Sequence, residues 1–97
     1  MFKELFIKLE TAENPVAIAI QKTVTTKVVA IAFKKGMILK EHKTEVPALL
    51  LVVKGSILYK EHILEEQILI YNERNIPTDI PHSLEALEDS LCILFKG

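Results

Sequence analysis

The residues of this chain best suited to chemistry are two histidines, His42 and His82. Depending on its surroundings, an imidazole acts as a metal ligand, a general base or a pH-sensitive hydrogen-bonding group. The two lie far apart in the sequence, so only the fold can bring them together. The third histidine, His62, falls on strand parity with Leu58 and Lys60. The sequence assigns it no role.

Other arrangements that support catalysis are absent. Cys92 is the only cysteine, so no intrachain disulfide can form, and its neighbours Leu91 and Ile93 predict a buried, inert thiol. With only three glycines there is no phosphate-cradling loop, and no G-x-S-x-G turn occurs. The acidic pair Glu65-Glu66 is expected on a solvated face. The sequence therefore assigns no catalytic residue.

Composition narrows the class of protein. The net charge is -1, from 12 basic and 13 acidic residues, which argues against nucleic-acid binding. The longest apolar run, residues 46–53, is much shorter than the roughly 20 residues of a membrane-spanning helix. The charged N-terminus does not resemble a signal peptide. We expect one domain over residues 1–97, with no membrane partner and a cytoplasmic location.

Short apolar runs separated by turn residues predict many strands. Residues 27–34 are apolar at alternate positions on both faces, so both faces need cover, from a second sheet or another subunit. Residues 48–53 have the same character. We expect the Lys54-Gly55 pair to form a two-residue hairpin turn, and residues 88–89 to form a second hairpin.

Two segments are ambiguous. Residues 2–9 carry apolar side chains at helical spacing, which fits a short helix or a strand. Residues 63–71 combine good helix formers with isoleucine-rich strand character. Because the strands follow one another through short turns, an all-β antiparallel sandwich or barrel is favoured over an α/β plan.

The middle of the chain resembles the first motif of the cupin family, G-x5-H-x-H-x3-E-x6-G. Gly36, His42 and Gly55 fall at the family spacing, whereas Thr44 and Ala48 replace the second histidine and the glutamate. The resemblance implies a cupin domain of the double-stranded β-helix (jelly-roll) type. Its core would span about residues 26–96, with residues 1–25 in dimer contacts.

The family's second motif, G-x5-P-x-G-x2-H, is matched in part. Pro77 and His82 are kept, and Tyr71 stands at the first glycine position. Because Tyr71 takes positive φ only at a cost, we expect the turn to shift to Asn72, which tolerates that geometry.

A metal-binding cupin would hold its ion with three histidines and a glutamate, so the resemblance leaves His42 and His82 as two of four ligand positions. Stable sites normally have at least three protein ligands. The Thr44 hydroxyl is a poor ligand for such a metal ion, and the Ala48 side chain has no ligand atom. We therefore expect no tightly bound cofactor, and at most weak Zn, Ni, Fe or Mn at the two histidines.

The leading hypothesis is a small-molecule-binding barrel without a tight metal. Its pocket candidates are His42, Thr44, Ala48, Leu50, Val52 and His82. One alternative is a metal-dependent or metal-free enzyme of the isomerase, decarboxylase or dioxygenase type. Another is a structural or interaction barrel plugged by Phe33, Ile38, Leu50 or Phe95. We also expect a homodimer, in which residues 14–23 pair against a sheet edge.

Overall fold

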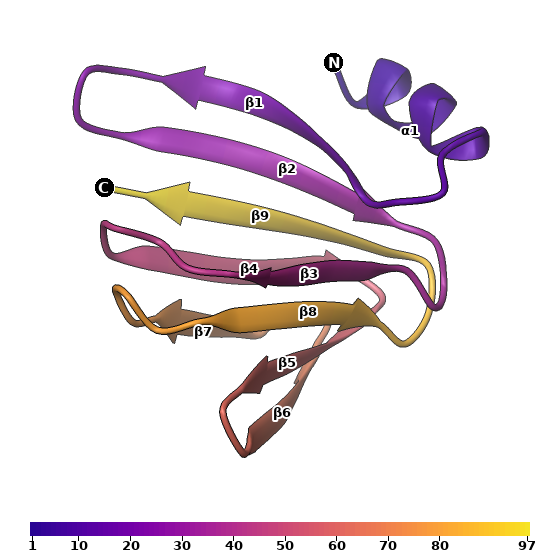
Figure 1. The fold of residues 1–97 in the computed structure, drawn as a ribbon. Coiled ribbons are helices and arrows are strands. Elements are labelled where there is room, and N and C mark those ends of the chain that lie inside the picture. Colours follow the sequence, from indigo (N-terminus) through magenta and orange to yellow (C-terminus); the bar gives the residue numbers. More distant parts are fainter.

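The computed structural model describes residues 1–97 as one helix and nine strands (Figure 1). Runs of β-branched and leucine residues form the strands, and Gly, Pro, Asn and Asp lie between them. In chain order the elements are α1 (Phe2–Glu10), β1 (Val16–Lys22), β2 (Lys27–Phe33), β3 (Ile38–His42), β4 (Ala48–Lys54), β5 (Ser56–Glu61), β6 (Leu64–Leu69), β7 (Glu73–Ile76), β8 (His82–Ala86) and β9 (Ser90–Lys96).

The strands form two sheets. One has the order β1-β2-β9-β4-β7 and the other β3-β8-β5-β6, with antiparallel pairing throughout. The predicted all-β antiparallel architecture is confirmed. The two ambiguous segments separate in type: residues 2–9 belong to α1, and most of residues 63–71 form β6.

The two predicted hairpins are wrong. β4 and β5 lie in different sheets, and so do β8 and β9, so both short turns carry the chain from one sheet to the other. The two corners touch: Gly55 has φ of 80°, and a Cβ there would lie 2.2 Å from Ser90 Oγ. The same Ser90 hydroxyl accepts from Ser56 N, and its proton faces the carbonyl oxygens of Glu88 at 2.7 Å and Ser56 at 3.1 Å. A turn that contains glycine does not by itself indicate whether the two strands that it connects pair with each other or belong to different sheets.

The core lies between the sheets, where alternate residues point inward. Its largest fully buried members include Tyr59, Phe33, Leu50, Ile57 and Val52. This leaves the opposite, apolar face of the five-stranded sheet in need of cover.

That outer face is covered in part by α1, which the expectation of a second sheet or another subunit over β2 did not include. Leu5 and Leu9 of α1 are buried against Ala30 and Ala32 of β2. The small alanine side chains let the helix approach the sheet closely. At nine residues, α1 is the only helix of the chain, and no helix here is long and apolar enough to cross a membrane.

The backbone retains left-handed conformations where the family motif has glycine. Tyr71 has φ of 68° and Asp79 has φ of 59°. The expected shift of the first turn to Asn72 is therefore wrong. Tyr71 N donates to Val52 O and Asn72 O accepts from Val52 N, so bonds to β4 fix this turn and force the conformation onto Tyr71.

Candidate functional site

His42 and His82 meet at one end of the barrel. They are direct partners in the β3–β8 register, and directly opposed residues project to the same face of a sheet. Their ring centroids lie 4.3 Å apart with an interplanar angle of 59°. The convergence that the motif spacing predicts is therefore observed. His82 is buried, at 2% exposure, and His42 is half-buried.

Each imidazole is held in the same way. Nδ1 of His42 donates to Lys40 O at 2.9 Å, and Nδ1 of His82 donates to Ile80 O at 3.1 Å. A carbonyl oxygen only accepts, so the proton of each neutral ring is on Nδ1, and each Nε2 has a free lone pair. No protein group binds either Nε2. Since the one fully buried side-chain N or O atom without a partner is Nε of Arg74, both Nε2 atoms retain solvent access.

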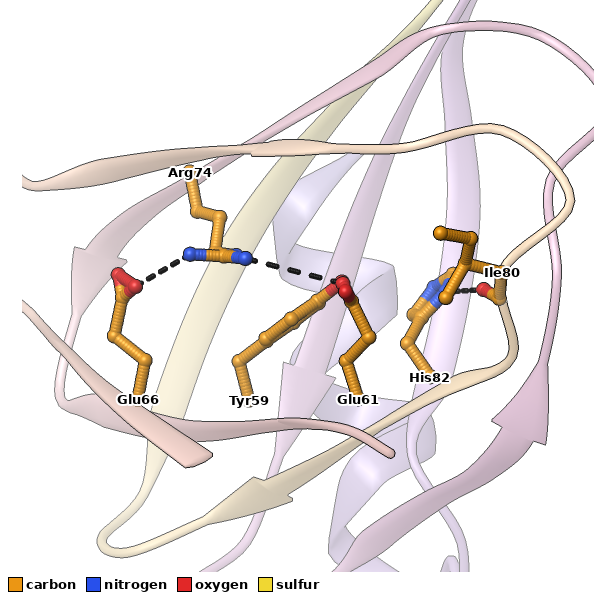
Figure 2. A network of polar contacts seen from close by, with 6 residues as sticks. All are labelled: Tyr59, Glu61, Glu66, Arg74, Ile80 and His82. Carbon is orange, nitrogen blue, oxygen red and sulfur yellow. Dashed lines mark hydrogen bonds and ion pairs between the residues drawn. The ribbon is translucent and has the colours of Figure 1, made fainter. Parts of the chain in front are cut away.

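An aromatic and cationic stack extends from His82 through Tyr59 to Arg74 (Figure 2). The Tyr59 ring, on β5, stacks on His82 at 5.7 Å with an interplanar angle of 20°. The guanidinium carbon of Arg74, on β7, lies 4.5 Å from the Tyr59 centroid. Because β5 and β7 belong to different sheets, Arg74 links the two sheets through this stack.

Two carboxylates complete the network. Tyr59 OH donates to Glu61 at 2.5 Å, and Arg74 donates to Glu66 at 2.5 Å and lies 3.8 Å from Glu61 (Figure 2). Glu66 was expected on a solvated face, and its side chain is 41% exposed, but it also lies directly opposite Tyr59 in the β5–β6 register and pairs with Arg74. The segment around Gln67-Ile68 fits either a helix or a strand, so the sequence did not predict the face on which the Glu66 side chain lies.

Burial sets the ionisation of the two rings at the centre. It raises the pKa of Tyr59 to about 12, reinforced by the Glu61 carboxylate that accepts the phenol proton. Burial also lowers the pKa of His82, as do the charges of His42 and Lys96, while the Ile80 carbonyl and Glu61 act against the shift. Neutral His82 and neutral phenol are therefore the favoured forms.

The remaining pocket candidates lie deeper. Thr44 is buried, and its hydroxyl donates to Val46 O at 2.8 Å. Ala48, Leu50 and Val52 point into the core, where Leu50 and Val52 are fully enclosed. None of the three surface hollows is lined by Leu50, Val52 or either paired histidine, and Ala48 borders one at the end of β4.

The residues expected for a plugged barrel divide into two groups. Phe33 and Leu50 are fully buried in the core, whereas Ile38 and Phe95 are 50% and 38% exposed. Side chains therefore fill the middle of the barrel, and the polar network occupies one end.

The four-ligand metal set of the cupin motif does not fit the residues present. Thr44 uses its hydroxyl on a backbone carbonyl, and Ala48 has no donor atom. No group of three or more His, Cys, Asp or Glu side chains is arranged to hold a metal ion. His62 lies exposed in the β5–β6 turn with φ of 51°, off the strand parity expected for it.

Comparison with known proteins rests on structure. No sequence model of a family matches the chain, and no curated protein sequence matches it. A cupin superfamily protein from Desulfitobacterium hafniense superposes with a TM-score of 0.82 at 11% identity, over 87% of this chain and 77% of that one.

Two further structures are similar. KdgF from Halomonas gives a TM-score of 0.79 at 22% identity, covering 89% of this chain and 82% of its own. A cupin-2 domain protein from Shewanella frigidimarina gives 0.76 at 12% identity, covering 99% of this chain and 91% of its own. With its two antiparallel sheets and its paired motif histidines, this chain has the fold of the cupin superfamily.

Proposed function

We propose that this chain is a small-molecule-binding barrel without a tightly bound metal, and that His42 and His82 recognise the ligand. The observation that carries the proposal is the fixed tautomer of both rings: each Nδ1 is held by a backbone carbonyl, and each Nε2 is free. The two rings that carry these acceptors have centroids 4.3 Å apart. They suit a ligand that offers two neighbouring donors, such as a vicinal diol.

The surrounding network supports this role. The lowered pKa of His82 keeps its Nε2 an acceptor at neutral pH. Tyr59 stacks on His82 and is in turn fixed by Glu61 and Arg74. A site whose side chains are already oriented loses less entropy when a ligand binds.

Calorimetry with catechol and cis-1,2-cyclohexanediol as probes tests the proposal. We expect saturable binding to the unmodified protein and loss of at least about tenfold in affinity in His82→Phe, since one hydrogen bond to a buried site is removed. His62→Asn is the matched control, because His62 lies exposed in a turn whose left-handed φ asparagine tolerates. Equal binding by all three proteins contradicts the proposal.

A second candidate is metal-free proton transfer. A neutral imidazole with a free Nε2 beside a second imidazole is the arrangement of a general base with a neighbouring proton acceptor. Dihydroxyacetone in D₂O is a suitable probe, because a base that removes the proton next to its carbonyl exchanges it for deuterium. Exchange above the rate of His82→Phe supports an enzyme, and equal rates exclude this activity for that probe.

We further propose a homodimer in the cytoplasm. β1 is an edge strand with one free side, and the directly paired row Val28, Phe95 and Leu49 leaves apolar surface on the outer face of the same sheet. Continuous sheet edges and apolar patches are habitual self-association surfaces. Light scattering at micromolar concentration should give twice the chain mass, and a monomer mass contradicts the proposal.

The single, buried Cys92 suits a reducing compartment.

A further inference from the structure

Three lysines lie directly opposite one another at one end of the five-stranded sheet. Lys22 of β1 pairs with Lys27 of β2, and Lys27 pairs with Lys96 of β9. Directly opposed side chains of like charge destabilise a sheet. A row of three therefore has an electrostatic cost that a bound anion would remove.

No Asp or Glu side chain forms an ion pair with this row. The ion pairs of the chain involve Lys60 and Arg74, and none includes a member of the lysine row. The row borders a surface hollow of about 230 Å³ that no Asp or Glu lines. The lining residues are Lys22, Thr23, Val24, Thr25, Thr26, Lys27, Val46 and Lys96.

The β1–β2 turn adds hydroxyl groups on a fixed backbone. Thr23 Oγ1 accepts from Thr26 N at 2.9 Å and from Thr25 N at 3.3 Å. It also lies 2.7 Å from Thr26 Oγ1. These bonds hold the turn without using the Thr25 hydroxyl, which stays available as a donor. Ammonium groups beside hydroxyl donors are the usual chemistry of oxyanion binding.

We propose that the lysine row and the threonine turn form a binding site for a compact, multiply charged oxyanion of the phosphate class. The hollow holds several times the roughly 30 Å³ share of one water, which leaves room for a phosphate group or a small phosphorylated molecule. The net charge of -1 argues against an extended polyanion. The hollow is lined by neither His42 nor His82, although the charge of Lys96 also acts on His82.

Thermal unfolding and calorimetry test the site with inorganic phosphate, against sodium chloride at equal ionic strength. Phosphate should raise the melting temperature of the unmodified protein. Lys27→Gln, at the centre of the row, should weaken phosphate binding about tenfold, because one charged donor is lost. In chloride alone the same variant should melt no lower than the unmodified protein, since a repulsion has been removed. Lys35→Gln, an exposed lysine outside the row, is the control and should leave binding unchanged.

Glycerol phosphate is a second probe. Comparing its affinity with that of inorganic phosphate shows whether the site prefers a phosphorylated small molecule or the free ion. Amide chemical shifts locate the site, and those of residues 23–26 should move on addition of either probe. The proposal is overturned if phosphate and chloride have equal effects. It is also overturned if Lys27→Gln binds as tightly as Lys35→Gln, or if residues 23–26 do not respond.

Discussion

His42 and His82 face each other across the β3–β8 pair with ring centroids 4.3 Å apart, and each donates its Nδ1 proton to the carbonyl two residues earlier in its own chain. Two neutral rings can share this space. Two imidazolium rings would repel each other there. The pair therefore couples the geometry of the site to its protonation.

The first prediction is a loss of stability in mild acid. Because the pKa of folded His82 lies below its ordinary value of 6.5, through burial first and then His42 and Lys96, the unfolded chain binds the proton first. The stability that neutral His82 contributes is therefore complete above the pKa of the unfolded chain and is lost as the pH falls toward the pKa of the folded protein. Glu61 raises the pKa of His82 and so reduces this effect. Urea unfolding should therefore give a lower free energy at pH 5 than at pH 8.

His82→Asn should show a smaller decrease between pH 8 and pH 5, because the group that titrates has been removed. His62→Asn removes an exposed histidine from a turn and should retain the full decrease. Identical pH dependence in the two variants would contradict the assignment to His82.

A second prediction concerns the phenol of Tyr59. The chain has two tyrosines and no tryptophan, so Tyr71→Phe leaves Tyr59 as the only chromophore that ionises. Absorbance at high pH should then show a midpoint near 12, with circular dichroism confirming that the fold persists. Glu61→Gln should lower the midpoint, because the carboxylate that holds the phenol proton is gone.

Glu65→Gln is the control for that titration, since Glu65 is exposed on the same stretch of chain and makes no bond to Tyr59. A midpoint near the ordinary value of 10 in the folded protein would contradict the buried placement of Tyr59. So would an equal response to the two glutamine substitutions.

A third prediction uses the strained turn. Tyr71 has φ of 68° and is 72% exposed, so its side chain contributes little packing. The left-handed conformation costs a non-glycine residue about 1–2 kcal/mol, and glycine costs about 0.5–1 kcal/mol in unfolded-state entropy. Tyr71→Gly should therefore stabilise the fold by about 0.5–1 kcal/mol, or a few degrees in melting temperature. Tyr71→Ala keeps the strain and should show no gain, and equal melting temperatures would indicate that no strain exists.

How far the sequence predicts this molecule depends on whether the information is local. The strands around Val29 and Leu50 and the meeting of His42 with His82 follow from periodicity and motif spacing, which are readable along the chain. The passage of the chain from one sheet to the other at Gly55 cannot be predicted from the local sequence, because a turn of the same composition also connects the strands of a hairpin. Arg74 is the clearest omission: it is the only arginine of the chain, but its contacts with Tyr59 and Glu66 arise only once β5, β6 and β7 are assembled.

A fourth prediction restores the missing metal ligands. The unmodified protein, purified without a histidine tag, should contain well under one transition-metal ion per chain. Thr44→His combined with Ala48→Glu should create a site for Zn or Ni if all four positions share one end of the barrel. Without metal this variant should be less stable, because Ala48 is buried and a carboxylate there loses its hydration.

Added metal should then raise the melting temperature of the double variant, because it binds only the folded state. Adding His82→Ala should abolish the rise. Stoichiometric metal in the unmodified protein would contradict the expectation of a weak site. A double variant that binds no metal would show that positions 44 and 48 do not share a cavity with the histidine pair.

The most direct test of the ligand site is long-range ¹H–¹⁵N spectroscopy of the three histidine side chains with and without catechol. We predict that His42 and His82 are Nδ1-protonated in the free protein, and that catechol shifts both Nε2 resonances saturably while those of His62 stay in place. Nε2-protonated rings in the free protein would contradict the account. So would a catechol response confined to His62, or one equal in all three histidines.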